Sequence, residues 1–263
     1  MARVLELAVP MVCRSALVLF LAVLAGCGGG GGGSGGSAGA AGGGEQPGPL
    51  AGAWYGAMED NTGQLHTLRL GIAGSRVTAF EVDGVDVGGK GPVGQDDGHV
   101  FSSTLTFPQG QQLQIVMFAD PAAKHFVYLD NFFEFGVLQK DATTLPAYAS
   151  IDVNGTWSGI SAFTDFARYD WDTSSAICIV GTCSVTEKDD RMTESFTVGF
   201  DSVFGRWLGT SVIKLPTGPD VNKVSRAFVS PDKTFVGVWR CLFAVDGSLL
   251  FPGKCTYSAW GRT

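Results

Sequence analysis

The sequence predicts an all-β protein with two tandem antiparallel units, each a small barrel or sandwich. One sign is alternation: Leu68, Leu70 and Ile72 share one face of a run whose intervening residues include Thr67 and Arg69, the period of a half-buried strand. A second is composition, because valine, threonine and phenylalanine recur in short runs between glycines and no long stretch has helical periodicity. The third is an internal repeat.

The repeat consists of three short segments that occur in the same order in both halves. Each half opens with a Gly-x-Trp motif, continues to a Pro-x-Gly turn and ends with a Pro-containing turn before an apolar run. The matching pairs are 52–56 with 155–159, 108–110 with 216–218, and 120–129 with 230–238. The nearly equal spacings favour a duplicated unit, and each unit is long enough to form a modest core.

The expected organisation follows in chain order. We expect a signal segment over 1–26, a cysteine and glycine-rich linker over 27–49, a first β unit over 50–142, a connector over 143–150 and a second β unit over 151–263. Besides the run near Leu68, the strand candidates are 76–82, 99–107, 111–118 and 124–129, then 191–200, 206–214, 223–229 and 234–239.

The first segment has the pattern of a secretory signal. Arg14 precedes an apolar run over 16–23, and the small residues Ala25 and Gly26 follow it. A membrane-spanning helix needs about 20 apolar residues, which this run does not reach. We therefore expect export followed by cleavage.

The sequence Leu24-Ala25-Gly26-Cys27 resembles the lipobox of bacterial lipoproteins. The resemblance implies a diacylglyceryl group on the Cys27 sulfur, cleavage before Cys27 and acylation of the new amino terminus, which together anchor a protein stably. Gly28 occupies the position where aspartate is associated with inner-membrane retention, so the resemblance implies the outer membrane. The alternative is an ordinary signal peptide with a coincidental cysteine.

The glycine-rich segment fits a tether. Twelve of the residues in 28–44 are glycine, and such a chain has nothing to bury and a high entropic cost of ordering. Over 28–49 a flexible chain spans about 25 Å on average. It would let a folded part stand off from the membrane to which Cys27 attaches it.

Charge and cysteine content limit the partners. The net charge of −7 without a basic cluster argues against nucleic acid and against anionic membrane surfaces. An even number of cysteines in an exported domain predicts disulfides, and sequence proximity favours the pairs Cys178–Cys183 and Cys241–Cys255. A four-cysteine zinc site is the rival, but it lacks a Cys-x-x-Cys knuckle.

The sequence contains no clear catalytic motif. The segment 84–90 fits G-x-x-x-x-G-K, but Gly91 and Pro92 follow it, so we expect a turn and not a phosphate loop. His66, His99 and His125 have no metal-ligand spacing, and no nucleophile elbow occurs. We predict no enzymatic activity, no metal and no cofactor. Paired carboxylates could still meet in the fold.

One stretch suits recognition. Phe163, Phe166, Tyr169 and Trp171 interleave with Arg168 and three aspartates, a mixture suited to stacking on a sugar or gripping a polar ring. The alternative is a strand pair whose aromatic side chains cover the core.

The ends of each unit resemble lipocalin-type barrels. In that family a first-strand tryptophan plugs one end of the barrel beneath a basic residue of the last strand. The resemblance implies that Trp54 lies under Lys140, and Trp157 under Arg262.

These observations predict an outer-membrane lipoprotein of the bacterial cell envelope that serves as a non-enzymatic binding or scaffolding module. Its partners would be an envelope protein, a glycan or a small apolar ligand. The alternatives are a lipocalin-like carrier of a small apolar ligand, and an envelope hydrolase or hydrolase inhibitor.

Overall fold

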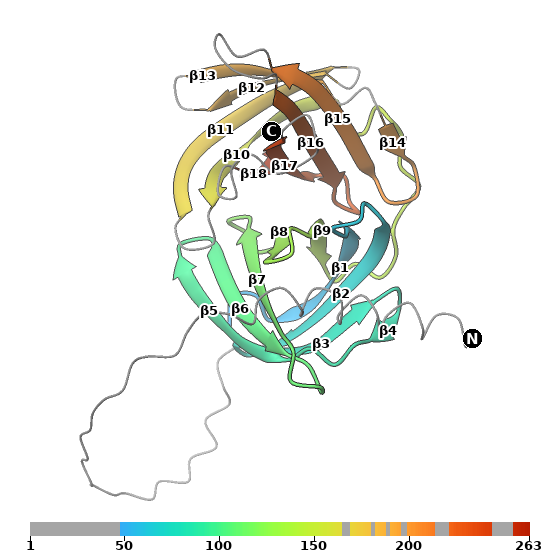
Figure 1. The fold of residues 1–263 in the computed structure, drawn as a ribbon, viewed down its shortest axis with the longest axis vertical. Coiled ribbons are helices and arrows are strands. Elements are labelled where there is room, and N and C mark those ends of the chain that lie inside the picture. The colour runs from blue at the N-terminus through green and yellow to red at the C-terminus, as the bar shows by residue number, and fades with distance from the viewer. Residues whose placement is uncertain are drawn as a thin grey trace, which may run out of the picture.

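A computed structural model describes residues 48–164, 169–179, 182–187, 190–195, 199–213, 221–243 and 255–263. Its secondary structure is entirely β, as predicted, and forms two nine-stranded antiparallel sheets that lie against each other (Figure 1). No helix in the described part of the chain is long and apolar enough to span a membrane. The predicted signal segment, Cys27 and the tether up to residue 47 lie outside these residues, and only Gly48 and Pro49 of the tether are described.

The first sheet closes into an eight-stranded barrel. Its strands are β1 (Gly52–Glu59), β2 (Leu65–Ala73), β3 (Arg76–Val82), β4 (Val85–Asp86), β5 (Gly91–Asp97), β6 (Val100–Thr106), β7 (Gln112–Ala119), β8 (His125–Asp130) and β9 (Phe135–Lys140). The ladder runs β2-β1-β9-β8-β7-β6-β5-β3, and the pairing of β2 with β3 closes it, while the short β4 pairs with β3. Closure leaves this barrel without a free sheet edge on its main strands.

The second sheet has the same plan but remains open. Its strands are β10 (Gly155–Thr164), β11 (Tyr169–Ile179), β12 (Thr182–Glu187), β13 (Asp190–Ser195), β14 (Gly199–Asp201), β15 (Arg206–Ile213), β16 (Val221–Val229), β17 (Phe235–Phe243) and β18 (Cys255–Arg262). The order is β13-β12-β11-β10-β18-β17-β16-β15-β14. The sheet curls into a half-barrel, and no ladder joins β13 to β14 within the described residues.

The strand registers make the two units comparable position by position. Trp54 on β1 pairs with Lys140 on β9, and Trp157 on β10 pairs with Arg262 on β18. Starting from these pairs, the ladders relate residues on the paired strands of one unit to counterparts in the other. The predicted duplication is therefore visible in the pairing of the strands as well as in the sequence.

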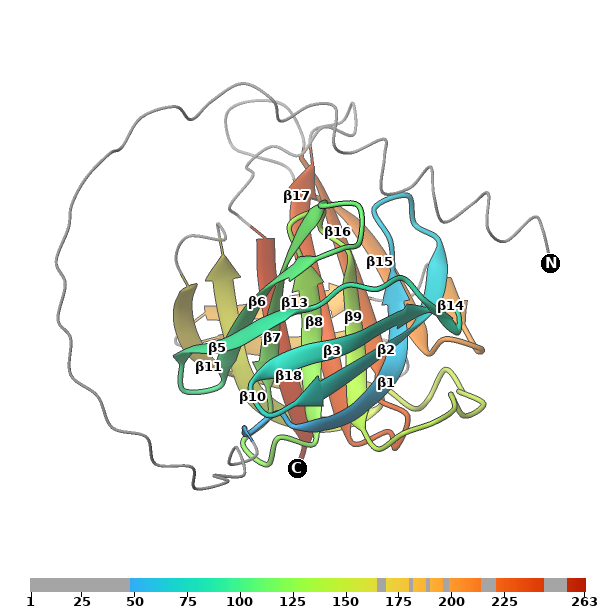
Figure 2. The same ribbon diagram turned by 90° about the horizontal axis from the view of Figure 1, so that it is seen from below.

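Three apolar cores hold the molecule together. One fills the barrel, around Trp54 and Leu68, and one lies inside the half-barrel, around Trp157 and Val236. The third lies between the two sheets, where the outer faces of β8 and β9 meet those of β16, β17 and β18 (Figure 2). Because successive side chains of β8 and β17 point to opposite faces of their sheets, each strand has one face inside its own unit and the other in this interface.

Contacts across the interface are reciprocal. The ring of Phe118 stacks on Tyr257 at 6.1 Å between centroids, and Phe135 contacts Phe228 at 5.7 Å. Phe228 is the counterpart of Phe118, and Tyr257 is the counterpart of Phe135. Such reciprocity is the property of an isologous interface, so the units pack about a local pseudo-two-fold axis.

Two details differ from the sequence predictions. Gly91 and Pro92 begin β5, where a turn was expected; proline is tolerated at a strand start because its missing N–H costs no central ladder bond. At Gly91 a Cβ would lie 2.1 Å from the Thr104 carbonyl oxygen, so only glycine allows this approach. The run 191–200, expected as one strand, contains all but the first residue of β13 and the start of β14.

The cysteine pairing agrees with the sequence. Cys178–Cys183 links β11 to β12, and Cys241–Cys255 links β17 to β18. The first disulfide belongs to the half-barrel core and the second to the core between the sheets. The zinc alternative is excluded because all four thiols are used.

Candidate functional site in the half-barrel

Both units are plugged at one end in the same way. The indole N–H of Trp54 donates to the Leu50 carbonyl, and that of Trp157 donates to the Val153 carbonyl, each at 2.8 Å. Lys140 Nζ lies 5.8 Å from the Trp54 ring centroid. The guanidinium carbon of Arg262 lies 4.7 Å from that of Trp157. The expected arrangement is present in both units, with an indole fully buried beneath a cation.

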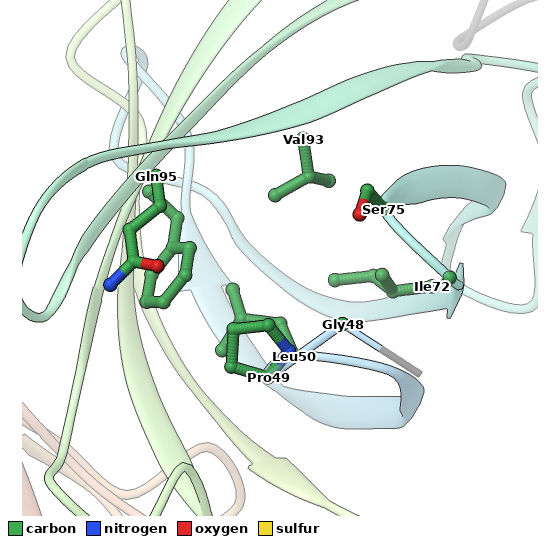
Figure 3. Close-up of a pocket in the computed structure, with 9 residues that line it drawn as sticks. Gly48, Pro49, Leu50, Ile72, Ser75, Val93 and Gln95 are labelled. Atoms are coloured by element: carbon green, nitrogen blue, oxygen red, sulfur yellow. The ribbon is translucent and has the colours of Figure 1, made fainter. Parts of the chain in front are cut away.

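The interior of the first barrel is filled by its own side chains. Apolar residues from seven of its strands converge there, including Met58, Leu68, Leu70, Ile115 and Met117. A small pocket of about 140 Å³ lies between Leu50, the β2–β3 turn and β5, lined by Ile72, Val93 and Gln95 among others (Figure 3). Typical ligand pockets measure roughly 300–1,000 Å³, so this pocket is smaller than a usual ligand site.

The interior of the second unit is polar at the corresponding positions. Serine replaces an apolar residue or glycine at four buried sites: Ser161 corresponds to Met58, Ser174 to Leu68, Ser225 to Ile115 and Ser258 to Gly136. On the neighbouring strand, Arg240 takes the place of Asp130. The two units therefore share the order of their paired strands but differ in the chemistry of their interiors.

Five of these side chains form a connected group, which we call the polar cluster: Ser161, Ser174, Ser258, Arg240 and Trp260. Ser161 Oγ lies 2.7 Å from both Ser174 Oγ and Ser258 Oγ. Arg240 Nη2 donates to Ser258, and the Trp260 indole N–H donates to Ser174 at 2.7 Å. All five are at least nine-tenths buried, where polar groups are stable only with hydrogen-bond partners.

A further donor lies in the same layer. Trp207 on β15 stands in one cross-strand row with Ala227, Val238, Ser258 and Ser161. Its side chain is 1 % exposed and belongs to the half-barrel core. No described residue accepts a hydrogen bond from its indole N–H. The counterpart of Trp207 in the first barrel is Phe101, which has no such donor.

Sequence reasoning did not find this cluster, since serines in strands carry no distinctive pattern. The predicted recognition stretch belongs to the same unit: Phe163 stands near the end of β10, and Tyr169 and Trp171 stand at the start of β11. Phe166 and Arg168 lie outside the described residues, and the side chains of the other three are not among those described. Their proposed role in recognition stays a prediction.

Carboxylates gather at one end of the first barrel, where they accept hydrogen bonds that stabilise its turns. Asp130 accepts hydrogen bonds from the backbone N–H groups of Phe132 and Glu134 and from the Tyr128 hydroxyl. Burial raises the pKa of Asp130 to about 6, and burial and the negative charge of Asp130 raise the pKa of Glu134 to about 9. The pair therefore retains a proton at neutral pH. We assign it a structural role in the β8–β9 turn.

Within the described ranges, no group of three or more His, Cys, Asp or Glu side chains is placed to hold a metal ion. His66 instead contacts Asp83 at 2.7 Å, and His125 contacts Asp120 and Asp232 at 2.7 and 2.9 Å. These histidines connect turns.

Comparisons with known proteins assign no activity. No protein-family model matches the chain, and no curated protein does. A solved structure of a protein of unknown function from the DUF3598 family of Nostoc punctiforme is similar at 13 % identity, with a TM-score of 0.34. The match covers 82 % of this chain and 97 % of that one.

Proposed function

We propose that this chain is a lipid-anchored binding protein of the bacterial cell envelope, without enzymatic activity, and that its half-barrel is the binding unit. The observation that carries the binding role is the contrast between the two interiors. The interior of the first barrel is mostly apolar and includes the buried Asp130, whereas the second has buried serines where the first has apolar residues or glycine, and Arg240 where the first has Asp130.

A polar interior is expensive for a protein that needs only a stable fold. Each buried hydroxyl gains little over an apolar side chain of suitable shape, and any unmatched hydrogen bond costs about 1–3 kcal/mol. The first barrel shows that the fold can be built with apolar residues or glycine at the positions of these four serines. We therefore assign the polar interior of the second unit to ligand binding.

Anchoring at the membrane is supported by the lipobox-like sequence and by the glycine-rich tether after Cys27. Lipid at Cys27 would hold the protein at the outer membrane, and the tether would let the two β units reorient toward a ligand. The protein could then bind and release its ligand while it stays attached to the membrane.

The anchor is tested by expressing the full chain and its Cys27→Ser variant in a Gram-negative bacterium and separating them by detergent phase partition. We expect wild-type protein in the detergent phase, and variant protein either uncleaved or in the aqueous phase. The matched control is Cys13→Ser, which should leave the detergent fraction unchanged. Cleaved Cys27→Ser protein that still enters the detergent phase completely would refute lipidation.

A further inference from the structure

We infer that the end of the molecule at which both units are plugged lies against the membrane surface, where the exposed side chains of Ile151, Ile177 and Ile179 enter the lipid interface. We call these three residues the isoleucine patch. The inference rests on the lipid anchor of the proposed function and names a second contact with the same membrane. It is supported by the direction of the two units, the position and surroundings of the patch, and the place where the described chain begins.

The plugged ends of the two units point the same way. The ring of His125 stacks on its counterpart Phe235, and Val127 lies opposite its counterpart Gly237. Equivalent positions can meet in successive pairs along two strands only when those strands run parallel. The pseudo-two-fold axis therefore runs along β8 and β17, and it relates two ends that face in one direction.

One turn joins the two plugged ends directly. It connects β16 to β17, and the backbone N–H of Asp232 within it donates to the side chain of Gln139, the neighbour of Lys140, at 2.7 Å. The carbonyl of Thr234 in the same turn accepts a bond from the backbone N–H of Arg262 at 2.8 Å. The two cations that cover the plugging tryptophans thus lie at one end of the molecule, the lower edge in Figure 2, where the C-terminus is marked.

The isoleucine patch lies at this end of the half-barrel. Ile177 and Ile179 face outward at the end of β11, beside the first residues of β10. Ile151 lies in the turn before β10, where the carbonyl of its neighbour Asp152 accepts a bond from Arg262 at 2.8 Å. The exposed fractions of the three isoleucines are 66 % at 151, 55 % at 177 and 66 % at 179. The protein therefore leaves three large apolar side chains in contact with solvent at its plugged end.

The strand neighbours of the patch are polar but uncharged. Ile177 pairs with Thr156 and Ser184, and Ile179 pairs with Thr182, and all three hydroxyl side chains are exposed. Exposed apolar side chains with a polar rim mark contact sites. A rim of hydroxyls can hydrogen-bond to lipid headgroups, and it enters the interface without the cost of desolvating a charge. Three isoleucines expose far less surface than the roughly 800 Å² that each partner buries in a standard protein interface, so a lipid surface fits the patch better.

The described chain begins at the same end. Gly48 stands two residues before Leu50, whose carbonyl accepts the bond from the plugging tryptophan, and a Cβ on Gly48 would lie 2.6 Å from the Gly74 carbonyl oxygen. Residues 28–47 separate it from Cys27, and a glycine-rich chain of that length spans about 25 Å on average. Lipid at Cys27 would hold the plugged end near the bilayer at an effective concentration on the order of millimolar. A contact too weak to bind a free protein to a membrane is then sufficient.

The experiment measures how far lipids brominated in their acyl chains quench tryptophan fluorescence. Mature full-length protein, purified from the envelope of a Gram-negative bacterium, is added to phosphatidylcholine vesicles with and without brominated lipid, and flotation measures its attachment. Ile177→Trp reports on the patch, and Gln109→Trp, in the exposed β6–β7 turn at the opposite end, is the matched control. We expect brominated lipid to remove at least half of the emission that Ile177→Trp adds to wild type, and almost none of that added by Gln109→Trp.

Two further variants separate the isoleucine contact from the behaviour of the introduced indole. Ile151→Trp should be quenched as strongly as Ile177→Trp, and it carries the test if thermal unfolding shows that Ile177→Trp is not folded. Addition of Ile151→Asp and Ile179→Asp to Ile177→Trp should reduce the quenching at least twofold and leave flotation unchanged.

The possible results distinguish the contact from the anchor. Protein that floats with the vesicles while neither patch reporter is quenched more than Gln109→Trp would refute the contact and leave the anchor in place. A second copy or a protein partner on the patch would give this result, because bromine quenches only at close range. Quenching that persists with both aspartates present would refute the role of the isoleucines. Mature protein that does not float would refute the anchor, and the contact with it.

Discussion

At the scale of single residues, His125 carries the connection between the units. Its Nδ1 faces Asp120 of its own unit and its Nε2 faces Asp232 of the other, and the ring stacks on Phe235, its own counterpart, at 5.1 Å. A neutral imidazole has one N–H, so only the imidazolium can donate to both carboxylates. Burial, the largest influence, lowers the pKa of His125, but the two carboxylates together raise it above its ordinary value.

This arrangement predicts that the stability gained from the contact of His125 with both units depends on pH. Because the folded-state pKa of His125 is raised, its contribution to stability is complete below the ordinary value near 6.5 and is lost as the pH rises through the folded-state value. The loss amounts to about 1.4 kcal/mol for each unit by which the pKa is raised. We expect the difference in unfolding free energy between wild type and His125→Gln, measured in urea, to shrink between pH 6 and pH 9.

The difference in unfolding free energy between the two proteins is measured, and not the stability of wild type alone, because Glu134 also titrates in this range. Its titration contributes equally to both proteins. His66→Gln provides a comparison in which the histidine contacts only its own barrel. A difference for His125→Gln that is constant over this range would mean that the ring is neutral in the folded protein.

At the scale of strands and hairpins, the sequence predicted well what depends on local pattern. Alternation located most strands, Gly-x-Trp marked the first strand of each unit, and proximity gave both disulfides. The polar cluster could not be predicted because its members come from β10, β11, β17 and β18. Matching Ser174 with Leu68 requires the cross-strand registers, and the sequence offset between counterparts changes from strand to strand with the lengths of the connecting turns.

The two disulfides should differ in their contribution to stability. Cys241–Cys255 closes a loop with a sequence separation of 14, against 5 for Cys178–Cys183, and a loop of about 15 residues contributes roughly 3 kcal/mol in the chain-entropy model. We expect the Cys241→Ala/Cys255→Ala protein to lose more unfolding free energy in urea than Cys178→Ala/Cys183→Ala. The opposite order would show that strand contacts outweigh chain entropy here.

At the scale of the whole molecule, the two units resemble the protomers of a symmetric dimer joined in one chain. Matching faces of β8 and β17 are buried against each other, and Glu59 of the first unit pairs with Arg206 and Arg226 of the second at 3.1 and 3.2 Å. A shared apolar core makes each unit part of the other's stability. In the proposed function, the first barrel acts as the support and the interior of the half-barrel takes the binding role.

The shared core predicts cooperative unfolding that a single side chain can interrupt. Gly237 on β17 lies opposite its counterpart Val127, and an added Cβ would lie 2.5 Å from Val137 Cγ2 and 2.9 Å from Val127 Cγ2. Valine at this position must push the sheets apart, because branched side chains on both sides have little rotamer freedom. We expect Gly237→Val to cost about 1–3 kcal/mol and to split the single calorimetric transition of the wild type into two. Gly94→Val is the matched control, since a Cβ there meets nothing closer than 3.9 Å; if Gly237→Val keeps one transition at the wild-type temperature, the sheets are not packed as described.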